Sequence, residues 1–319
     1  MTALWNYADK VEGLPIGYNP DDRPSILFVK LGAAGDVVRT TTLLHLFRQW
    51  DIDWLVAKEN KELLPESVIR NVFTDVDQIP FQSEYDQVIN LEDEEVLTRR
   101  LCDRIKHGRS FGAIIDPKGK FSYTANSSTW FDMSLISRYG IQVANELKLQ
   151  NRLSYQEILF SSLGSLYRGE TYILPSSYPR SSLTGDIAVA PVAGKRWPMK
   201  NWSYFNELIE LLSHDYQVNV LPQRETILEH LGDIANHKLV ICNDSLPMHL
   251  GLGLGLHVVS FFTCTSPWEI YDYGLLTKLV SPRLHEYFYR RGSSPEAAGA
   301  IGLKEAYDAC IRELTPVYK

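Results

Sequence analysis

A short run of small residues leads into a single carboxylate near the start of the sequence. Residues 31–35, which end in Gly35, follow the apolar run 25–30 and precede Asp36. Small residues let the backbone turn tightly and leave room for a ligand, although this run matches neither the dinucleotide fingerprint nor the P-loop. A carboxylate here removes the proton of an incoming hydroxyl when it lies within about 3 Å of it. Alternatively, Asp36 caps the following helix, and the sequence leaves both interpretations open.

A second polar segment, residues 243–249, leaves one apolar run and enters another. Ser245 is a favourable helix cap, and Pro247 fits the first helical turn, where the N–H that it lacks has no partner. Such a turn presents backbone N–H groups and the positive end of the helix dipole, which suit a phosphate. His249 lies one turn further on, where it either donates to the same anion or is a hydrogen-bonded core residue.

Two adjacent cations, Lys195 and Arg196, follow the apolar run 186–190. Lysine holds a phosphate as a point charge and arginine as a two-pronged donor, so the pair could bind a diphosphate. A solvated surface pair is the alternative. No Asp-x-Asp element or other metal-ligand cluster lies near the three segments. The sequence is therefore consistent with a site that needs no metal or cofactor, provided that these cations neutralise the diphosphate.

Alternating apolar runs and amphipathic stretches must position these groups. In the first half, strands are predicted at 25–30, 53–57, 75–79, 87–91 and 113–116, and helices at 37–50 and 92–106. In the second half, strands are predicted at 186–190, 217–221, 238–242 and 257–262, and helices at 202–213, 226–234 and 247–254. This alternation is typical of the α/β class with parallel, doubly wound sheets, in which ligands bind at the carboxyl ends of the strands.

A connector rich in proline and serine, residues 174–185, divides the two series of strands. We expect one domain at 1–173 and a second at 174–319, with the last helix allowed to pack back on the first domain. The 319 residues are 45% hydrophobic, as in globular proteins, and are too many for one typical domain.

Charge and composition exclude several classes of protein. A net charge of -7 argues against a general nucleic-acid binder, which needs a basic face. The four cysteines have neither zinc-site nor disulfide spacing, and the N-terminus shows no signal-peptide pattern. The most apolar stretch, 250–264, is too short to span a bilayer. The sequence predicts a soluble, cytoplasmic protein.

Taken together, residues 27–40, 195–198 and 243–250 resemble glycosyltransferase family 9, the ADP-heptose heptosyltransferases of bacterial surface polysaccharides. The three segments occur in the family's order and with similar spacing. The resemblance implies a GT-B architecture, in which two Rossmann-like doubly wound domains face a central cleft. It also implies an inverting, metal-independent transfer of a sugar, with the acceptor on the N-terminal domain and the nucleotide-sugar donor on the C-terminal domain.

The resemblance assigns a role to individual residues. Asp36 matches the family's general base. Lys195 matches the cation on the donor diphosphate, and Glu225 is the nearest match to an acidic residue near the donor's ribose. The full set of implied donor-binding residues is Gly35, Lys195, Arg196, Glu225, Asp244, Ser245, Leu246 and His249.

Four features depart from the family pattern, and they affect the identity of the donor more than the class of reaction. One is the segment between Glu225 and Lys238, which is shorter than usual. Leu246 stands where the family usually has glycine, Arg39 stands where many members carry histidine, and residues 263–268 replace a Gly-Pro-Thr stretch near the sugar. Leu246 keeps a second hypothesis open, a catalytically silent module that binds a nucleotide sugar. A Rossmann oxidoreductase is a third, disfavoured by the missing Gly-x-Gly-x-x-Gly pattern.

The acceptor is predicted only as a class, a surface glycan such as lipopolysaccharide core or a related glycoconjugate. Arg39, Lys118 and Lys120 are candidate contacts to an acidic acceptor or a phosphate, although a solvated loop is an alternative for the two lysines. The carboxylates at 92–95 are expected at a solvated helix start. A lipid-linked acceptor implies peripheral contact with a membrane.

Overall fold

The structure is a computed structural model, which describes residues 23–133, 138–194 and 197–315. The chain divides into two compact units. The first contains residues 1–148 and 153–176, and the second contains residues 149–152 and 177–319. The main division after Ser176 falls inside the predicted connector 174–185.

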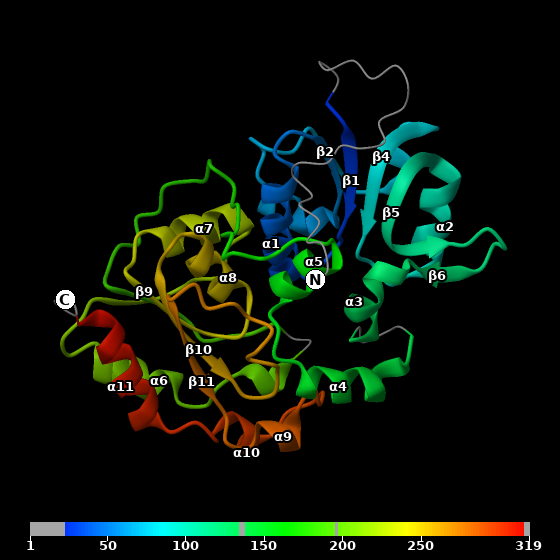
Figure 1. The fold of residues 1–319 in the computed structure, drawn as a ribbon. Coiled ribbons are helices and arrows are strands. Elements are labelled where there is room, and N and C mark those ends of the chain that lie inside the picture. Colours follow the sequence, from blue (N-terminus) through cyan, green and yellow to red (C-terminus); the bar gives the residue numbers. More distant parts are fainter. Residues whose placement is uncertain (1–22, 134–137, 195–196, 316–319) are drawn as a thin grey trace. The chain divides into compact units, whose positions relative to one another are not determined.

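The first unit is built on one sheet with the strand order β3-β2-β1-β4-β5-β6. Its strands are β1 (Ser25–Val29), β2 (Asp51–Leu55), β3 (Asn71–Phe73), β4 (Ser83–Asn90), β5 (Ile105–Ile115) and β6 (Phe121–Tyr123). All neighbours pair in parallel except β5 and β6. Residues 26–29 of β1 are fully buried, as expected for a central parallel strand covered on both faces. Strands β2 and β3 lie on one side of β1, and β4 to β6 lie on the other, so the switch point of the sheet is between β1 and β4, which are side by side in Figure 1. Sheets of the α/β class bind ligands at such a switch point.

The helices of this unit connect these strands or follow β6. They are α1 (Ala34–Thr40), η1 (Thr41–Phe47), η2 (Lys58–Leu63), η3 (Val76–Gln78), α2 (Glu95–Arg104), η4 (Ala125–Ser127), α3 (Ser128–Asp132), α4 (Gly140–Gln150) and α5 (Tyr155–Ser162). The prediction of a strand at 75–79 is wrong, because Val76–Gln78 forms a 3-10 turn. The Asp75 carboxylate accepts a hydrogen bond from the Asp77 N–H and so caps that turn. Aspartate favours such local bonds over a strand.

The second unit contains a sheet with the order β11-β10-β9-β7-β8, in which every pair is parallel. Its strands are β7 (Ile187–Ala190), β8 (Val218–Val220), β9 (Leu239–Asn243), β10 (His257–Phe262) and β11 (Leu276–Val280). The switch point of this sheet lies between β7 and β9. Both sheets thus follow the doubly wound pattern that the sequence predicts.

The helices of the second unit are η5 (Pro198–Lys200), α6 (Phe205–Leu212), α7 (Ile227–Ala235), α8 (Leu246–Gly253), α9 (Leu284–Tyr287), α10 (Pro295–Ala298) and α11 (Leu303–Leu314). Trp202 stacks on Phe261 in the core, with ring centroids 4.1 Å apart. The last helix, α11, contributes Ala306, Ala309 and Cys310 to the same core and packs beside α6 (Figure 1). It therefore helps to complete the core of its own unit.

Among the described residues, no helix combines the length and the apolar character needed to cross a membrane.

Candidate functional site

Asp36 lies just beyond the carboxyl end of β1, in the first turn of α1. The cap of this helix is Ala33, because the small residues before Asp36 already adopt helical geometry. The interpretation of Asp36 as a helix cap is therefore wrong. Its side chain is 32% exposed and accepts a hydrogen bond from the Arg39 guanidinium at 2.5 Å. Gly35 precedes it in the same turn.

Arg39 is buried and is held in place from a distant part of the sequence. Its guanidinium lies 4.1 Å from the centre of the Tyr155 ring, at the start of α5. The Tyr155 hydroxyl and the Thr40 hydroxyl share a hydrogen bond of 2.6 Å. Burial, together with the negative charge of Asp36, raises the pKa of Tyr155 well above its usual value, so this phenol stays neutral. Tyr155 was not among the predicted site residues.

Glu92 supports the loop that leads to Asp36. Its Oε1 accepts hydrogen bonds from Lys30 Nζ at 2.8 Å and from the Leu31 N–H at 2.7 Å. Lys30 is buried, and its ammonium also donates to the Gly32 carbonyl. The expectation that the carboxylates at 92–95 lie at a solvated helix start is therefore wrong for Glu92, since α2 begins only at Glu95.

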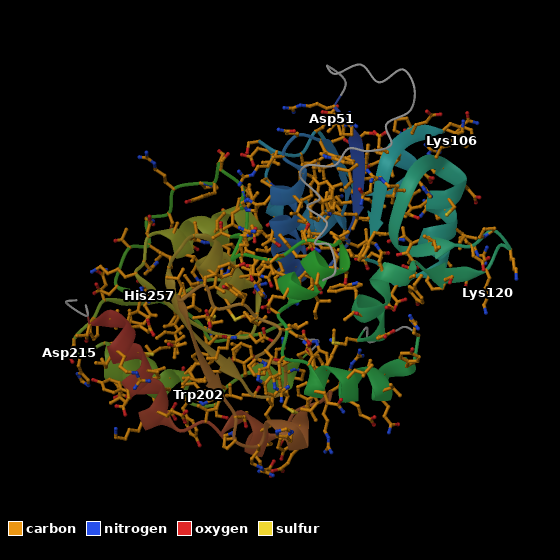
Figure 2. The ribbon with its side chains drawn as sticks, in the orientation of Figure 1. Asp51, Lys106, Lys120, Trp202, Asp215 and His257 are labelled. Carbon is orange, nitrogen blue, oxygen red and sulfur yellow. The ribbon has the colours of Figure 1, made fainter. Side chains whose placement is uncertain are left out.

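Lys118 and Lys120 are exposed on the turn between β5 and β6. The backbone N–H groups of both donate to Asp116 Oδ1 at 2.9 Å, so this carboxylate closes the turn. Figure 2 shows Lys120 extending outward from the tip of that turn. The structure does not bring either lysine together with Asp36.

In the second unit, Asp244 follows β9 at the β7/β9 switch point. Its Oδ2 accepts hydrogen bonds from Lys200 Nζ at 2.7 Å and from the Thr265 hydroxyl at 2.6 Å. Burial acts to raise the pKa of Asp244, but the charge of Lys200 and the hydrogen bonds from Lys200 and Thr265 outweigh it, and the pKa lies below its ordinary value. Asp244 is therefore an ionised, buried carboxylate.

Lys200 is a site residue that the sequence patterns missed. It ends η5, and its Nζ donates to both the carboxylate and the main-chain carbonyl of Asp244, at 2.7 and 2.8 Å. The predicted cations Lys195 and Arg196 lie outside the described residues. A third cation in the same short segment was the signal in the sequence that could have identified Lys200.

The strand ends that flank this site are joined by Asn243. Its amide donates to the Pro191 carbonyl at 2.9 Å, and its carbonyl oxygen accepts from the Trp202 N–H at 3.1 Å. Since Pro191 directly follows β7 and Asn243 ends β9, these bonds tie together the two strands of the switch point.

Ser245, Leu246 and His249 all lie at the start of α8. Ser245 is the cap residue, as its type predicts, but its hydroxyl donates to the Asn243 carbonyl at 3.1 Å and makes no capping hydrogen bond. Leu246 is the half-buried first residue of the helix, and His249 is buried one turn later. Behind them, a side chain at Gly251 would lie 3.0 Å from a methyl group of Val258, so α8 packs closely on its sheet.

Glu225 is exposed in the loop between β8 and α7. The loop is anchored one residue earlier, where the Arg224 guanidinium makes a two-pronged pair with the buried Asp233 at 2.7 and 2.9 Å. Glu225 is thus accessible on a fixed loop.

Within the described part of the chain, no three histidine, cysteine or acidic side chains are grouped so that they could share a metal ion.

Comparisons with known proteins give two kinds of match. Residues 205–287 match the model of glycosyltransferase family 9 (heptosyltransferase). The chain is similar to this family. The matched residues include Glu225, Asp244, Ser245, Leu246 and His249, and they do not include Asp36. A search of curated protein sequences gives no match.

Solved structures extend the family similarity to the fold of nearly the whole chain. A family 9 glycosyltransferase from Veillonella parvula is 15% identical, with a TM-score of 0.60 over 92% of this chain and 97% of that chain. E. coli heptosyltransferase WaaC, solved with ADP, is 15% identical, with a TM-score of 0.57 over 91% and 100%. E. coli ADP-heptose lps heptosyltransferase II is 15% identical, with a TM-score of 0.55 over 91% and 98%.

These matches confirm the predicted resemblance to family 9, the GT-B fold class with two Rossmann-like domains, and the prediction of a glycosyltransferase. At this level of identity the structural matches show the fold alone. The roles of the individual site residues therefore stay predictions, as does the cleft between the domains.

Proposed function

We propose that this protein transfers heptose from ADP-heptose to a hydroxyl group of a surface glycan or related glycoconjugate. The transfer inverts the anomeric carbon and needs no metal. The observation that carries the proposal is the position of Asp36, a partly exposed carboxylate at the β1/β4 switch point, held by a buried arginine. The similarity to heptosyltransferases supports the choice of donor.

In this mechanism Asp36 acts on the acceptor. As the acceptor oxygen forms a bond to the anomeric carbon, its proton moves to the Asp36 carboxylate. The bond between the anomeric carbon and the diphosphate oxygen breaks at the same time, and ADP leaves with the electron pair. Arg39 orients the Asp36 carboxylate through the 2.5 Å hydrogen bond.

The second unit carries the groups for the diphosphate. The start of α8 offers backbone N–H groups and the positive end of a helix dipole. Asp244 alone would repel a diphosphate, but Lys200 neutralises its charge. Lys195 and Arg196 are proposed to stabilise the charge that develops on the departing ADP, and Glu225 is proposed to contact the ribose.

The proposal places the reaction in the cytoplasm, with peripheral membrane contact where the acceptor is lipid-linked. It is tested by incubating the purified protein with ADP-heptose and with truncated surface glycans from a strain that lacks it. Mass spectrometry should detect a glycan heavier by one heptose, together with one ADP released per product. ADP binding without any heptosylated product would contradict the proposal.

The second candidate function is a catalytically silent module that binds nucleotide sugars. Such a module would bind ADP without forming any heptosylated product. The observation that favours it is Leu246, a bulky residue at the first position of α8, where the family pattern has glycine. Restoring glycine by Leu246→Gly separates the two functions. A transferase should keep or gain activity, whereas a silent module should remain inactive.

A further inference from the structure

A pocket of about 180 Å³ opens in the first unit, at the carboxyl edge of the sheet. Leu31 follows β1, Leu55 ends β2 and Asp75 follows β3, and all three line this pocket together with residues from α2. Leu31 and Asp36 both follow β1, and sheets of the α/β class bind ligands beyond the carboxyl ends of their strands. None of the predicted site residues lines it.

The floor of the pocket is apolar. Leu55 and Leu97 belong to the buried cluster between the sheet and α2, and Leu31 packs against that cluster. Val96, on the first turn of α2, lines the same pocket and is 65% exposed. The apolar floor is thus continuous with an exposed apolar side chain on the wall of the pocket, and binding sites for small ligands are concave and lined largely by apolar side chains.

The rim of the pocket is charged, with more acid than base. Arg100 donates to Asp75 at 2.8 Å and also pairs with Asp77 at 3.1 Å, so its charge is already balanced. Glu94 adds a further exposed carboxylate beside the start of α2. An anionic ligand would be repelled by this rim, whereas hydroxyl and ammonium groups could donate to its carboxylates.

We propose that this pocket binds one uncharged or amino-substituted sugar ring of the acceptor glycan. The apolar wall suits the C–H face of a sugar, and the rim suits its hydroxyls. The volume is below the ~300–1,000 Å³ typical of sites for drug-sized ligands, which limits the pocket to about one ring. The inference rests on the proposed transferase function, and it identifies the acceptor contacts as Asp75, Glu94 and Val96 instead of Lys118 and Lys120.

The binding of three probes to the full-length protein tests the charge argument. These are the methyl glycosides of glucose, glucosamine and glucuronic acid, compared by saturation-transfer NMR. The glucoside and the glucosaminide should bind, and the glucuronide should bind at least about tenfold more weakly, since tenfold corresponds to only ~1.4 kcal/mol. Glu94→Lys should reverse the preference between glucuronide and glucosaminide. Equal binding of all three probes would overturn the proposal.

The location is tested by filling the pocket. Val96→Trp should weaken binding of the methyl glucoside by about tenfold or more, again equivalent to ~1.4 kcal/mol. Leu166→Trp is the matched control, since Leu166 is 73% exposed in the same unit and does not line the pocket. Both variants should keep the wild-type melting temperature, because both side chains are exposed. Undiminished glucoside binding by Val96→Trp would place the sugar elsewhere.

The transfer assay separates this inference from the proposed function. Asp36→Asn should bind methyl glucoside as the wild type does, because Asp36 does not line the pocket. Glucoside binding without any heptose transfer would remove the proposed function and leave a sugar-binding pocket. Heptose transfer that is insensitive to Val96→Trp would keep the function and overturn the pocket.

Discussion

Each of the two units places a carboxylate and a cation at the switch point of its sheet, but the two pairs differ in burial and in bonding. In the first unit, the Asp36 side chain is 32% exposed and its partner Arg39 is 10% exposed. In the second unit, Asp244 is 12% exposed and Lys200 is 15% exposed, and Asp244 also accepts a hydrogen bond from Thr265.

The Asp36–Arg39 and Asp244–Lys200 pairs occupy equivalent positions in two sheets of the same type, and their different burial suits them to different chemistry. A carboxylate that takes a proton must be reached by the substrate, and Asp36 is accessible while its partner is fixed. The role proposed for Asp244, organising a binding turn, requires an ionised and fixed carboxylate, and its bonds to Lys200 and Thr265 favour both properties. The following predictions test this contrast, starting with the largest expected effect.

Asp36→Asn should lower turnover by about 10²–10⁴-fold, the usual contribution of general base catalysis. ADP binding should be unchanged, because the proposed donor groups lie in the second unit. The measurement is single-turnover transfer together with calorimetric titration of ADP. Asp103→Asn, an exposed acid on α2, is the charge-matched control and should behave as the wild type does. Turnover near the wild-type value in Asp36→Asn would remove Asp36 from the role of base.

Lys200→Met should destabilise the protein by ~3 kcal/mol, because it leaves a buried carboxylate without its counter-charge. Urea unfolding followed by circular dichroism measures the change. Asp244→Asn in the same chain should restore much of the lost stability by removing the unpaired charge. Lys238→Met is the control, since Lys238 pairs with Asp186 at an exposed position and should matter little. An equal loss of stability in Lys200→Met and Lys238→Met would show that burial does not strengthen the Lys200–Asp244 pair.

The Asp244–Lys200 pair should lose its contribution to the free energy of unfolding at acidic pH. The pKa of Asp244 is lowered in the folded protein from the ordinary value of 3.8, so the unfolded chain binds the proton more tightly. The pair therefore contributes its full stability above about pH 4 and loses it as the pH falls further. Unfolding free energies measured from pH 6 to pH 2 should show this loss in the wild type and a smaller one in Asp244→Asn.

Tyr155→Phe should cost about 1 kcal/mol of stability, the usual contribution of a hydrogen bond such as that to Thr40. Turnover should fall less than in Asp36→Asn, because the ring that supports Arg39 remains. The folded state raises the pKa of Tyr155 above the ordinary value of 10.0, so stability is lost as the pH rises past that value. Tyr155→Phe should show a smaller loss in alkaline unfolding experiments, and an unchanged alkaline loss would contradict the burial argument.

The smallest effect is expected from Lys118→Ala combined with Lys120→Ala. Both side chains are exposed, and the Asp116 bonds that close their turn use backbone N–H groups only. Turnover and the KM for the acceptor should change by less than about twofold, as is usual for exposed positions. A large rise in the KM for the acceptor would indicate that Lys118 or Lys120 contacts the acceptor.

The sequence predicted the elements that are rich in local signal. The strands at β1, β4, β7, β9 and β10 were predicted because the buried parts of parallel strands appear as short apolar runs. The helix predicted at 226–234 is α7, and the structure shows that Thr226 and Glu229 form a capping box at its start. Where the local signal was ambiguous, as at Asp75–Ile79, the prediction failed, since an aspartate that caps a turn also fits an alternating strand pattern.

The sequence also predicted part of the candidate site, again where the signal is local. Asp244 and Ser245 were predicted because they come directly after a strand, and Asp36 because a short run of small residues leads from a strand to it; both signals can be read from the chain itself. Tyr155, Glu92 and Thr265 were missed because their partners are far away in sequence. For example, Tyr155 contacts Arg39 across more than a hundred intervening residues.

The sequence by itself determined the two doubly wound units and the strand ends that carry the polar residues, because periodicity, turn residues and caps act over a few positions. Only the tertiary structure decided which carboxylate is accessible, which cation neutralises which acid, and where the core opens into a pocket. Those properties depend on burial and on contacts between distant segments, and the pattern along a single chain does not contain them.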